Sequence, residues 1–247
     1  VVIVVGGIAV GGTGKTPLCI SLLQRLSDLG YTVGLLSRGY KGKSKEYPLV
    51  VTTASNVEET GDEPLLIKLS VKEKATVVVD PNRERGAQYL EKLGVDVIVT
   101  DDGLQHYALE RDIEIIVIDA QRMLGNGFLL PAGPLREGEW RLNSADIVVT
   151  NGNPAEPKKN YQSMHLVPSP AVSIESFCSN QGYHDYLQKG TNVVALAGIG
   201  NPNRFYNTLK SCGYNIVSTI DIGDHGVVSK QILINNSKKY PIVMTAK

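Results

Sequence analysis

The sequence opens on Val1-Val-Ile-Val-Val-Gly-Gly-Ile-Ala-Val-Gly-Gly-Thr-Gly-Lys-Thr16, in which β-branched residues run directly into a glycine-rich loop. The apolar run predicts a buried strand. Leucines at positions 18, 22, 26 and 29 follow the loop at the spacing of one helix face, and Gly30 supplies a stop signal for that helix. A strand, a glycine-rich loop and a helix N-terminus in this order predict a cradle for phosphate groups.

The loop has the chemistry as well as the context of the phosphate loop of P-loop proteins. Gly11, Gly12 and Gly14 let the backbone curl so that successive N–H groups point at phosphate oxygens. Lys15 can reach the β- and γ-phosphates of a nucleoside triphosphate, and the Thr16 hydroxyl can ligate Mg²⁺. We therefore predict a nucleoside triphosphate site here.

Six apolar runs in the first part of the chain predict the strands of one sheet. Their nearly continuous valine and isoleucine content is typical of strands that are covered on both faces. Amphipathic helical segments lie between them, so we expect an α/β fold of the P-loop NTPase type, with a parallel sheet and helices on both faces. The six runs are Val1–Val5, Thr32–Leu36, Thr76–Val79, Val95–Thr100, Ile113–Ile118 and Ile147–Thr150.

The rhythm of strands and helices breaks at residues 151–170, where four prolines and several polar residues predict a linker or crossover. Residues 1–150 are therefore expected to form the core domain. Residues 171–247 predict a smaller C-terminal α/β unit that is truncated at its end. Its expected strands and helices are Asn192–Ala197, Arg204–Ser211, Asn215–Asp221, Ser229–Asn236 and Ile242–Thr245.

Composition excludes several classes of protein. The 247 residues include 25 Lys+Arg and 25 Asp+Glu, and a formal net charge of zero gives no electrostatic footprint for nucleic acid. The 3 cysteines are odd in number and far apart, which excludes a disulfide framework and a CxxC metal or redox pair. The longest stretch without a charged or strongly polar residue, Val1 to Gly12, is shorter than the roughly 20 residues that a spanning helix needs.

Carboxylates follow two of the expected strands. Asp101 and Asp102 come directly after Val95–Thr100, at the strand end where ligands of open α/β sheets bind. Adjacent carboxylates repel each other unless a cation offsets the repulsion, which favours a metal site. Asp119 follows the next strand, and for it a helix cap and a role in the site are equally good interpretations.

The segment that would contact the nucleotide base lacks the residues by which GTPases recognise guanine. Ile147–Thr150 runs into Asn151-Gly-Asn-Pro, without the Lys and Asp that GTPases place after the comparable strand. This argues against a GTPase and leaves ATP as the expected nucleotide.

Further motifs occur in a specific order and spacing along nearly the whole chain. They are Val10-Gly-Gly-Thr-Gly-Lys-Thr-Pro17, Leu36-Ser-Arg-Gly-Tyr40, Gly61-Asp-Glu-Pro64, Asp101-Asp-Gly-Leu-Gln-His106, Leu130-Pro-Ala-Gly-Pro-Leu-Arg-Glu137, Gly198-Ile-Gly-Asn-Pro202 with Arg204-Phe205, and Asp224-His225. Together they resemble the tetraacyldisaccharide 4'-kinase family of lipid A biosynthesis. The resemblance implies a lipid kinase that uses ATP and Mg²⁺ to phosphorylate the 4'-hydroxyl of an acylated glucosamine disaccharide 1-phosphate.

The resemblance also implies roles for individual residues. Asp62 would be the catalytic base, with His225 as its partner. His106 is expected to act only indirectly, as a structural hydrogen-bonding group. Ala9, Val10, Gly11, Gly12, Thr13, Gly14, Lys15 and Thr16 would cradle the ATP phosphates; Thr16, Asp101, Asp102 and Glu137 would lie at the metal; Arg136 would lie beside the transferred phosphate.

The resemblance also implies a place for the enzyme. Family members begin with a hydrophobic anchor helix, and this chain is expected to start after it. We therefore expect action at the cytoplasmic face of the inner membrane, although the chain itself has the composition of a soluble protein. A basic run, Arg38 to Lys45, is either a solvated loop or a surface for the anionic substrate or membrane.

Alternatives remain open at this point. Asp62 could equally be a helix N-cap before Leu65, Leu66 and Leu69. The glycine-rich loop alone would also serve an NTPase switch or chaperone without a lipid substrate, or a synthetase that makes an acyl-phosphate. The Asp62/His225 pair and the Leu135-Arg-Glu137 segment favour the kinase, because a switch has no need for them.

Overall fold

The computed structural model describes residues 1–155, 158, 160–178, 186–199, 202–223 and 226–245. The chain divides into two compact units, residues 1–166 and residues 167–247. Strand β8 (Tyr161–Met164) belongs to the first unit and lies inside the segment for which a linker or crossover is expected.

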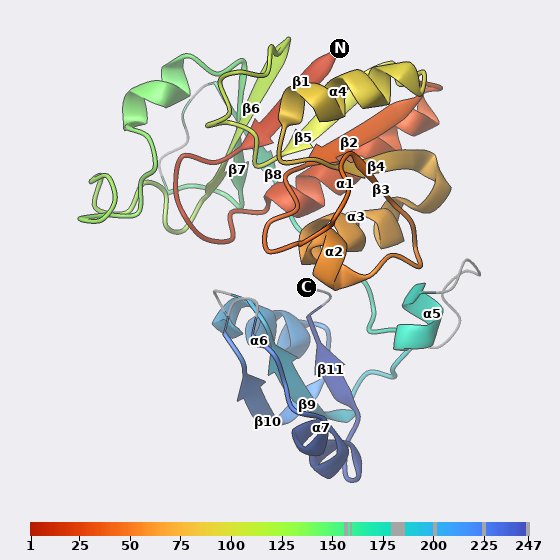
Figure 1. The fold of residues 1–247 in the computed structure, drawn as a ribbon. Coiled ribbons are helices and arrows are strands. Elements are labelled where there is room, and N and C mark those ends of the chain that lie inside the picture. The colour runs from red at the N-terminus through yellow and green to blue at the C-terminus, as the bar shows by residue number, and fades with distance from the viewer. Residues whose placement is uncertain (156–157, 159, 179–185, 200–201, 224–225, 246–247) are drawn as a thin grey trace. The chain divides into compact units, whose positions relative to one another are not determined.

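The first unit is built on an eight-stranded sheet with the order β3-β4-β2-β5-β1-β6-β7-β8. All neighbouring strands are parallel except the edge pair of β3 and β4, which is antiparallel. A mostly parallel sheet flanked by helices confirms the expected fold class (Figure 1). Besides β8, the strands are β1 (Val2–Gly6), β2 (Val33–Ser37), β3 (Leu49–Val51), β4 (Ala75–Val79), β5 (Val97–Asp101), β6 (Ile113–Asp119) and β7 (Ile147–Asn151).

The six strands expected from the apolar runs are all present, within two residues of the expected bounds. The two edge strands were not expected. β3 (Leu-Val-Val) is apolar but has only three residues, and β8 (Tyr-Gln-Ser-Met) is short and polar, so neither gives the long apolar run of a central strand. The helices of this unit are α1 (Lys15–Asp28), α2 (Val57–Thr60), α3 (Asp62–Val71) and α4 (Arg83–Lys92), with 3-10 turns η1 (Lys72–Lys74) and η2 (Glu139–Asn143).

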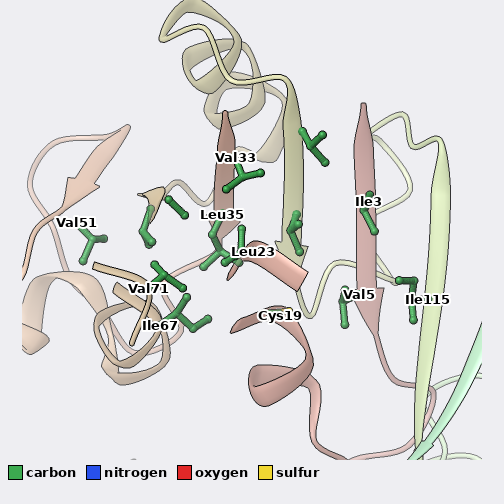
Figure 2. Packing of buried hydrophobic residues seen from close by; sticks show 14 of the residues in the cluster. Ile3, Val5, Cys19, Leu23, Val33, Leu35, Val51, Ile67, Val71 and Ile115 are labelled. Atoms are coloured by element: carbon green, nitrogen blue, oxygen red, sulfur yellow. The ribbon is translucent and has the colours of Figure 1, made fainter. Parts of the chain in front are cut away.

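Helices cover both faces of the sheet, which explains why its central strands are apolar throughout. On one face, Leu23 of α1 and Ile67 of α3 pack in one buried cluster with Leu35 of β2 (Figure 2). On the other face, Leu90 of α4 packs with Leu36, the next residue of β2. Neighbouring residues of a strand point to opposite faces, so both must be apolar.

The carboxyl ends of the central strands lie along one edge of the sheet. The register pairs Val5 of β1 with Asp101 of β5, and Asp119 of β6 with Asn151 of β7. The glycine-rich loop leaves β1 at the same edge. Strand register therefore brings together groups that are far apart in the sequence.

The second unit has a three-stranded parallel sheet with the order β10-β9-β11. Val193 and Ala195 of its central strand pack with Leu209 and Tyr214 in a small core. The expected strands and helices of this unit are all present. They are β9 (Asn192–Ala197), α6 (Pro202–Ser211), β10 (Asn215–Asp221), α7 (Lys230–Ser237) and β11 (Ile242–Met244). One further helix, α5 (Ile174–Cys178), was not expected.

Candidate active site

The glycine-rich loop joins β1 to α1 and leaves backbone N–H groups for a ligand. Gly11 and Gly14 have φ values of 97° and 100°, which side-chain-bearing residues rarely adopt. Gly14 occupies the N-cap position of α1 and supplies no side-chain cap. The first N–H groups of the helix therefore have no capping side chain, and the positive end of α1 suits an anion.

A segment distant in the sequence holds the loop in place. The Val10 N–H donates to the Pro134 carbonyl oxygen at 2.9 Å, and the Arg136 N–H donates to the Ile8 carbonyl oxygen at 2.6 Å. These bonds anchor the side chains of Arg136 and Glu137 beside the loop. The Leu-Pro-Ala-Gly-Pro-Leu-Arg-Glu motif thus has a structural reason to accompany the glycine-rich motif.

Asp102 lies between two cations at the end of β5. Its Oδ2 is 2.9 Å from Arg136 Nη1, and its Oδ1 is 3.6 Å from Lys15 Nζ. The residue has a φ of 47°, an uncommon backbone conformation that turns the chain immediately after the strand. Lys15, Asp102 and Arg136, which the sequence placed in one site, are therefore in direct contact.

Asp101 is buried, with 2% of its surface exposed. Burial raises the pKa of this carboxyl to about 7, and the negative charges of Glu63 and Asp102 add to the effect. Its Oδ1 has no hydrogen-bond partner among the described residues. Glu63 is the second residue of α3, so the start of that helix and the end of β5 influence each other electrostatically.

The acidic pair fits a magnesium ion. Asp101 Oδ1 and Asp102 Oδ1 are both buried oxygens without a hydrogen bond, as expected of groups that serve a cation. Within the described ranges no cluster of three or more His, Cys, Asp or Glu residues could hold a metal by itself. Mg²⁺ commonly takes one or two carboxylates and completes its shell with water and substrate phosphates, so two carboxylates suffice.

Glu137 belongs to a hydrogen-bond network that sequence reasoning missed. Its Oε1 accepts from Gln105 Nε2 at 2.6 Å, and its Oε2 accepts from the Tyr107 hydroxyl at 2.6 Å. Arg141 Nε lies 3.2 Å from Oε2. Gln105 also accepts from Arg136 Nη1 at 3.1 Å. Both oxygens of Glu137 therefore accept hydrogen bonds. A carboxylate oxygen has a further lone pair, so the metal role expected for Glu137 is compatible with this network.

Asp62 is the first residue of α3, and its Oδ1 accepts from the Glu63 N–H at 3.0 Å. The N-cap position belongs to Gly61, so the interpretation of Asp62 as the N-cap is wrong. Gly61 has a φ of 82°, and a Cβ there would lie 2.7 Å from the Tyr40 carbonyl oxygen. A side chain at position 61 would not fit, because the basic loop packs against this turn. His225, the expected partner of Asp62, lies outside the described residues.

Two other residues have structural roles in the described part of the chain. Asp119 caps the turn after β6, since its Oδ1 accepts from the N–H groups of Gln121 and Arg122 at 3.0 and 3.1 Å. Burial lowers the pKa of His106, and the charge of Arg83 adds to the effect. The His106 carbonyl oxygen accepts from Arg111.

The buried Asp101 gives the ligand-free protein a specific pH dependence. Its folded pKa of about 7 exceeds the usual value of 3.8, so the folded state binds more protons than the unfolded state between these values. Its contribution to stability is present at pH 4 and is lost as the pH rises through 7. We expect Asp101→Asn to gain on the order of 4 kcal/mol in unfolding free energy relative to wild type between pH 4 and 8, since one pKa unit corresponds to about 1.4 kcal/mol.

Urea unfolding of both proteins at several pH values, without nucleotide or metal, measures this difference. The Glu91→Gln variant, which removes an exposed carboxylate of α4, serves as the control for the loss of a negative charge. A flat difference for Asp101→Asn would contradict the assignment of a buried, protonated carboxyl.

The fold and the site define a class of protein. A parallel sheet whose first strand enters a Gly-Lys-Thr loop and a helix, with a carboxylate pair at the end of the adjacent strand, is the architecture of P-loop nucleotide-binding proteins.

The comparison with known families is more specific. The family model for tetraacyldisaccharide-1-P 4'-kinase (LpxK) matches residues 1–247. The chain belongs to this family, as the motifs predicted.

Individual relatives agree. The chain is 47% identical over 224 residues to tetraacyldisaccharide 4'-kinase of Aliivibrio fischeri (strain MJ11). This alignment covers 91% of this chain and 66% of the relative. It is 45% identical to that of Haemophilus influenzae (strain 86-028NP), over 100% of this chain and 72% of the relative. The chain thus spans about two thirds of the first of these relatives.

A solved structure shows the same fold. The chain resembles the crystal structure of the "apo" form of LpxK from Aquifex aeolicus in complex with ATP, with a TM-score of 0.74 and 28% identity. The match covers 99% of this chain and 77% of that one. Among the described residues, no helix is both long and apolar enough to span a membrane.

Proposed function

We propose that the chain transfers the γ-phosphoryl group of ATP to the 4'-hydroxyl of tetraacyldisaccharide 1-phosphate, a step of lipid A biosynthesis at the cytoplasmic face of the inner membrane. One observation supports this most directly: Asp102, at the end of β5, contacts both Lys15 of the glycine-rich motif at 3.6 Å and Arg136 at 2.9 Å. Family membership supports the lipid acceptor.

The reaction needs alignment, charge neutralisation and a proton acceptor. The acceptor oxygen forms a bond to the γ-phosphorus while the bond from that phosphorus to the β–γ bridging oxygen breaks, and ADP leaves. Asp62 takes the proton of the acceptor hydroxyl, and His225 orients it. Residues 9–16 hold the phosphates, and Arg136 beside them offsets the negative charge of the transferred group.

Thr16, Asp101 and Asp102 would hold Mg²⁺, which neutralises charge on the β- and γ-phosphates when it is bound. The Lys15 Nζ lies 3.6 Å from Asp102 Oδ1. This contact is long, and the flexible lysine side chain can turn from Asp102 to the phosphates. Transfer of label from γ-labelled ATP to the lipid acceptor tests this function.

The basic loop is proposed to face the anionic membrane or the substrate. Lys41, Lys43 and Lys45 are exposed, and the Lys43 N–H donates to the Glu58 carbonyl oxygen at 2.8 Å, which ties the loop to the turn before Asp62. A lysine near an anionic surface contributes about 1 kcal/mol of binding free energy. The loop thus combines a positive surface with a fixed place beside the proposed base.

We expect the triple variant Lys41→Ser, Lys43→Ser and Lys45→Ser to lose about tenfold or more in kcat/KM for lipid embedded in anionic vesicles. The loss should be much smaller in neutral detergent micelles. The matched control replaces Lys210, Lys238 and Lys239, which are exposed on the second unit. Equal activity of the two triple variants on anionic vesicles would remove the membrane role of the loop.

A further inference from the structure

Two side chains hold the phosphate loop from outside, and neither belongs to a motif that the function absorbs. Arg122, in the turn after β6, donates from Nη2 to the Gly12 carbonyl oxygen at 3.1 Å. Asn151, the last residue of β7, donates from Nδ2 to the Thr13 carbonyl oxygen at 3.1 Å. Two successive carbonyl groups of the loop are therefore fixed by side chains at the ends of two neighbouring strands, β6 and β7.

Fixing a carbonyl group also fixes the N–H group of the next residue. The peptide unit is planar and trans, so its C=O and N–H bonds point in opposite directions. Arg122 thereby directs the Thr13 N–H away from itself, and Asn151 does the same for the Gly14 N–H. Among the described residues, neither of these N–H groups donates to a protein acceptor, so both remain available to a ligand.

Two glycines of the loop make room for these side chains. A Cβ at Gly11 would lie 2.9 Å from Arg122 Nη1, and a Cβ at Gly14 would lie 2.6 Å from Asn151 Nδ2. The glycines are thus needed for the approach of the two side chains as well as for their positive φ values. The sequence pattern of the loop and the positions of Arg122 and Asn151 depend on each other.

The surroundings place both residues, Arg122 through its backbone and a long ion pair of its half-exposed side chain, and Asn151 through burial. Asp119 Oδ1 accepts from the Arg122 N–H at 3.1 Å, and Asp119 Oδ2 lies 3.9 Å from Arg122 Nη2. Asn151 is 3% exposed and is paired in register with Asp119. Side chains that bond the loop carbonyl groups can hold the loop in one conformation before a ligand arrives, which lowers the ordering cost of binding.

We propose that Arg122 and Asn151 are positioning residues that orient the Thr13 and Gly14 N–H groups toward the nucleotide phosphates. This inference rests on the proposed function, because it requires a nucleotide in the loop. Losing either side chain leaves the loop to be ordered by the nucleotide, so affinity for ATP falls. The effect is on binding of substrate and transition state alike, so KM for ATP rises while kcat changes little.

The test measures the Kd of Mg-ATP by calorimetry for Arg122→Ala and Asn151→Ala, together with the thermal unfolding midpoint without nucleotide. Arg25→Ala and Asn203→Ala, at exposed positions of α1 and α6, are the matched controls. We expect each single variant to raise Kd about tenfold, the equivalent of one hydrogen bond, and the controls to leave it unchanged.

Arg122→Lys, which keeps a donor, should recover part of the loss. The double variant should lose less than the product of the single losses, because both residues order the same loop.

The Asn151→Ala variant separates positioning from charge, because the Asn151 side chain bonds the loop but carries no charge. If only Arg122→Ala weakened binding, Arg122 would act by its charge on the phosphate, and two-sided positioning would be wrong. Variants that bind ATP like the controls, with or without a lower unfolding midpoint, would also overturn the inference. If variants weakened ATP binding but wild type phosphorylated no lipid, the proposed acceptor would fail and the positioning role would stand. If wild type bound no nucleotide, both would fall.

Discussion

Replacing Lys15 by alanine is expected to abolish phosphoryl transfer while leaving the fold intact. The ammonium group is the residue's main contribution to the loop, and it lies where it can neutralise charge on the β- and γ-phosphates. Loss of one such preorganised charge costs on the order of 10³-fold in kcat. Asp102 keeps its bond to Arg136 at 2.9 Å in the variant, so the ligand-free site retains a partner for that carboxylate.

The measurement is kcat with saturating ATP, alongside the thermal unfolding midpoint. Lys92→Ala, at an exposed position of α4, controls for the loss of a positive charge. A Lys15→Ala enzyme that retained most of its transfer activity would show that the glycine-rich loop has another role.

The second large effect is expected at Asp62, where the isosteric change Asp62→Asn removes the proposed proton acceptor. General-base catalysis contributes about 10²–10⁴-fold, so kcat should fall by that amount. KM for ATP should stay within about twofold, because Asp62 begins α3 and lies outside the phosphate loop. Asn keeps an oxygen that can accept the Glu63 N–H, so the helix start should survive.

Glu59→Gln is the matched control, since it removes an exposed carboxylate three residues away. An unchanged kcat in Asp62→Asn would transfer the proton-accepting role to another group. A rise in KM for ATP without a fall in kcat would assign Asp62 to nucleotide binding.

Sequence predicted the parts of this fold that bury apolar surface. Each central strand is packed on both faces, so it is made mostly of valine, isoleucine and leucine and could be recognised without a structure. The edge strands β3 and β8 were not predicted, because β3 has only three residues and β8 is polar. Asp62 was placed one residue too early in its helix because Gly61 takes a conformation that a cap motif does not predict.

The site residues also fall into two groups, those that local sequence motifs predict and those that only the structure brings together. Lys15 and the Asp101-Asp102 pair lie in local motifs whose chemistry can be interpreted along the chain. The bonds of Gln105 to Glu137 and of Asn151 to Thr13 join residues 32 and 138 positions apart, and no local pattern marks them. Asn151 entered the sequence analysis only because lysine and aspartate are absent after it. Its contact with the loop needed the strand register.

The measurement that tests the kinase assignment most directly is transfer of ³²P from γ-labelled ATP to detergent-solubilised tetraacyldisaccharide 1-phosphate, with Mg²⁺ present and Asp62→Asn run in parallel. The account predicts a labelled lipid whose phosphate is on the 4'-oxygen, formed by wild type and nearly absent with the variant. Release of labelled inorganic phosphate without a labelled lipid would instead identify a hydrolytic P-loop switch, and would contradict the assignment.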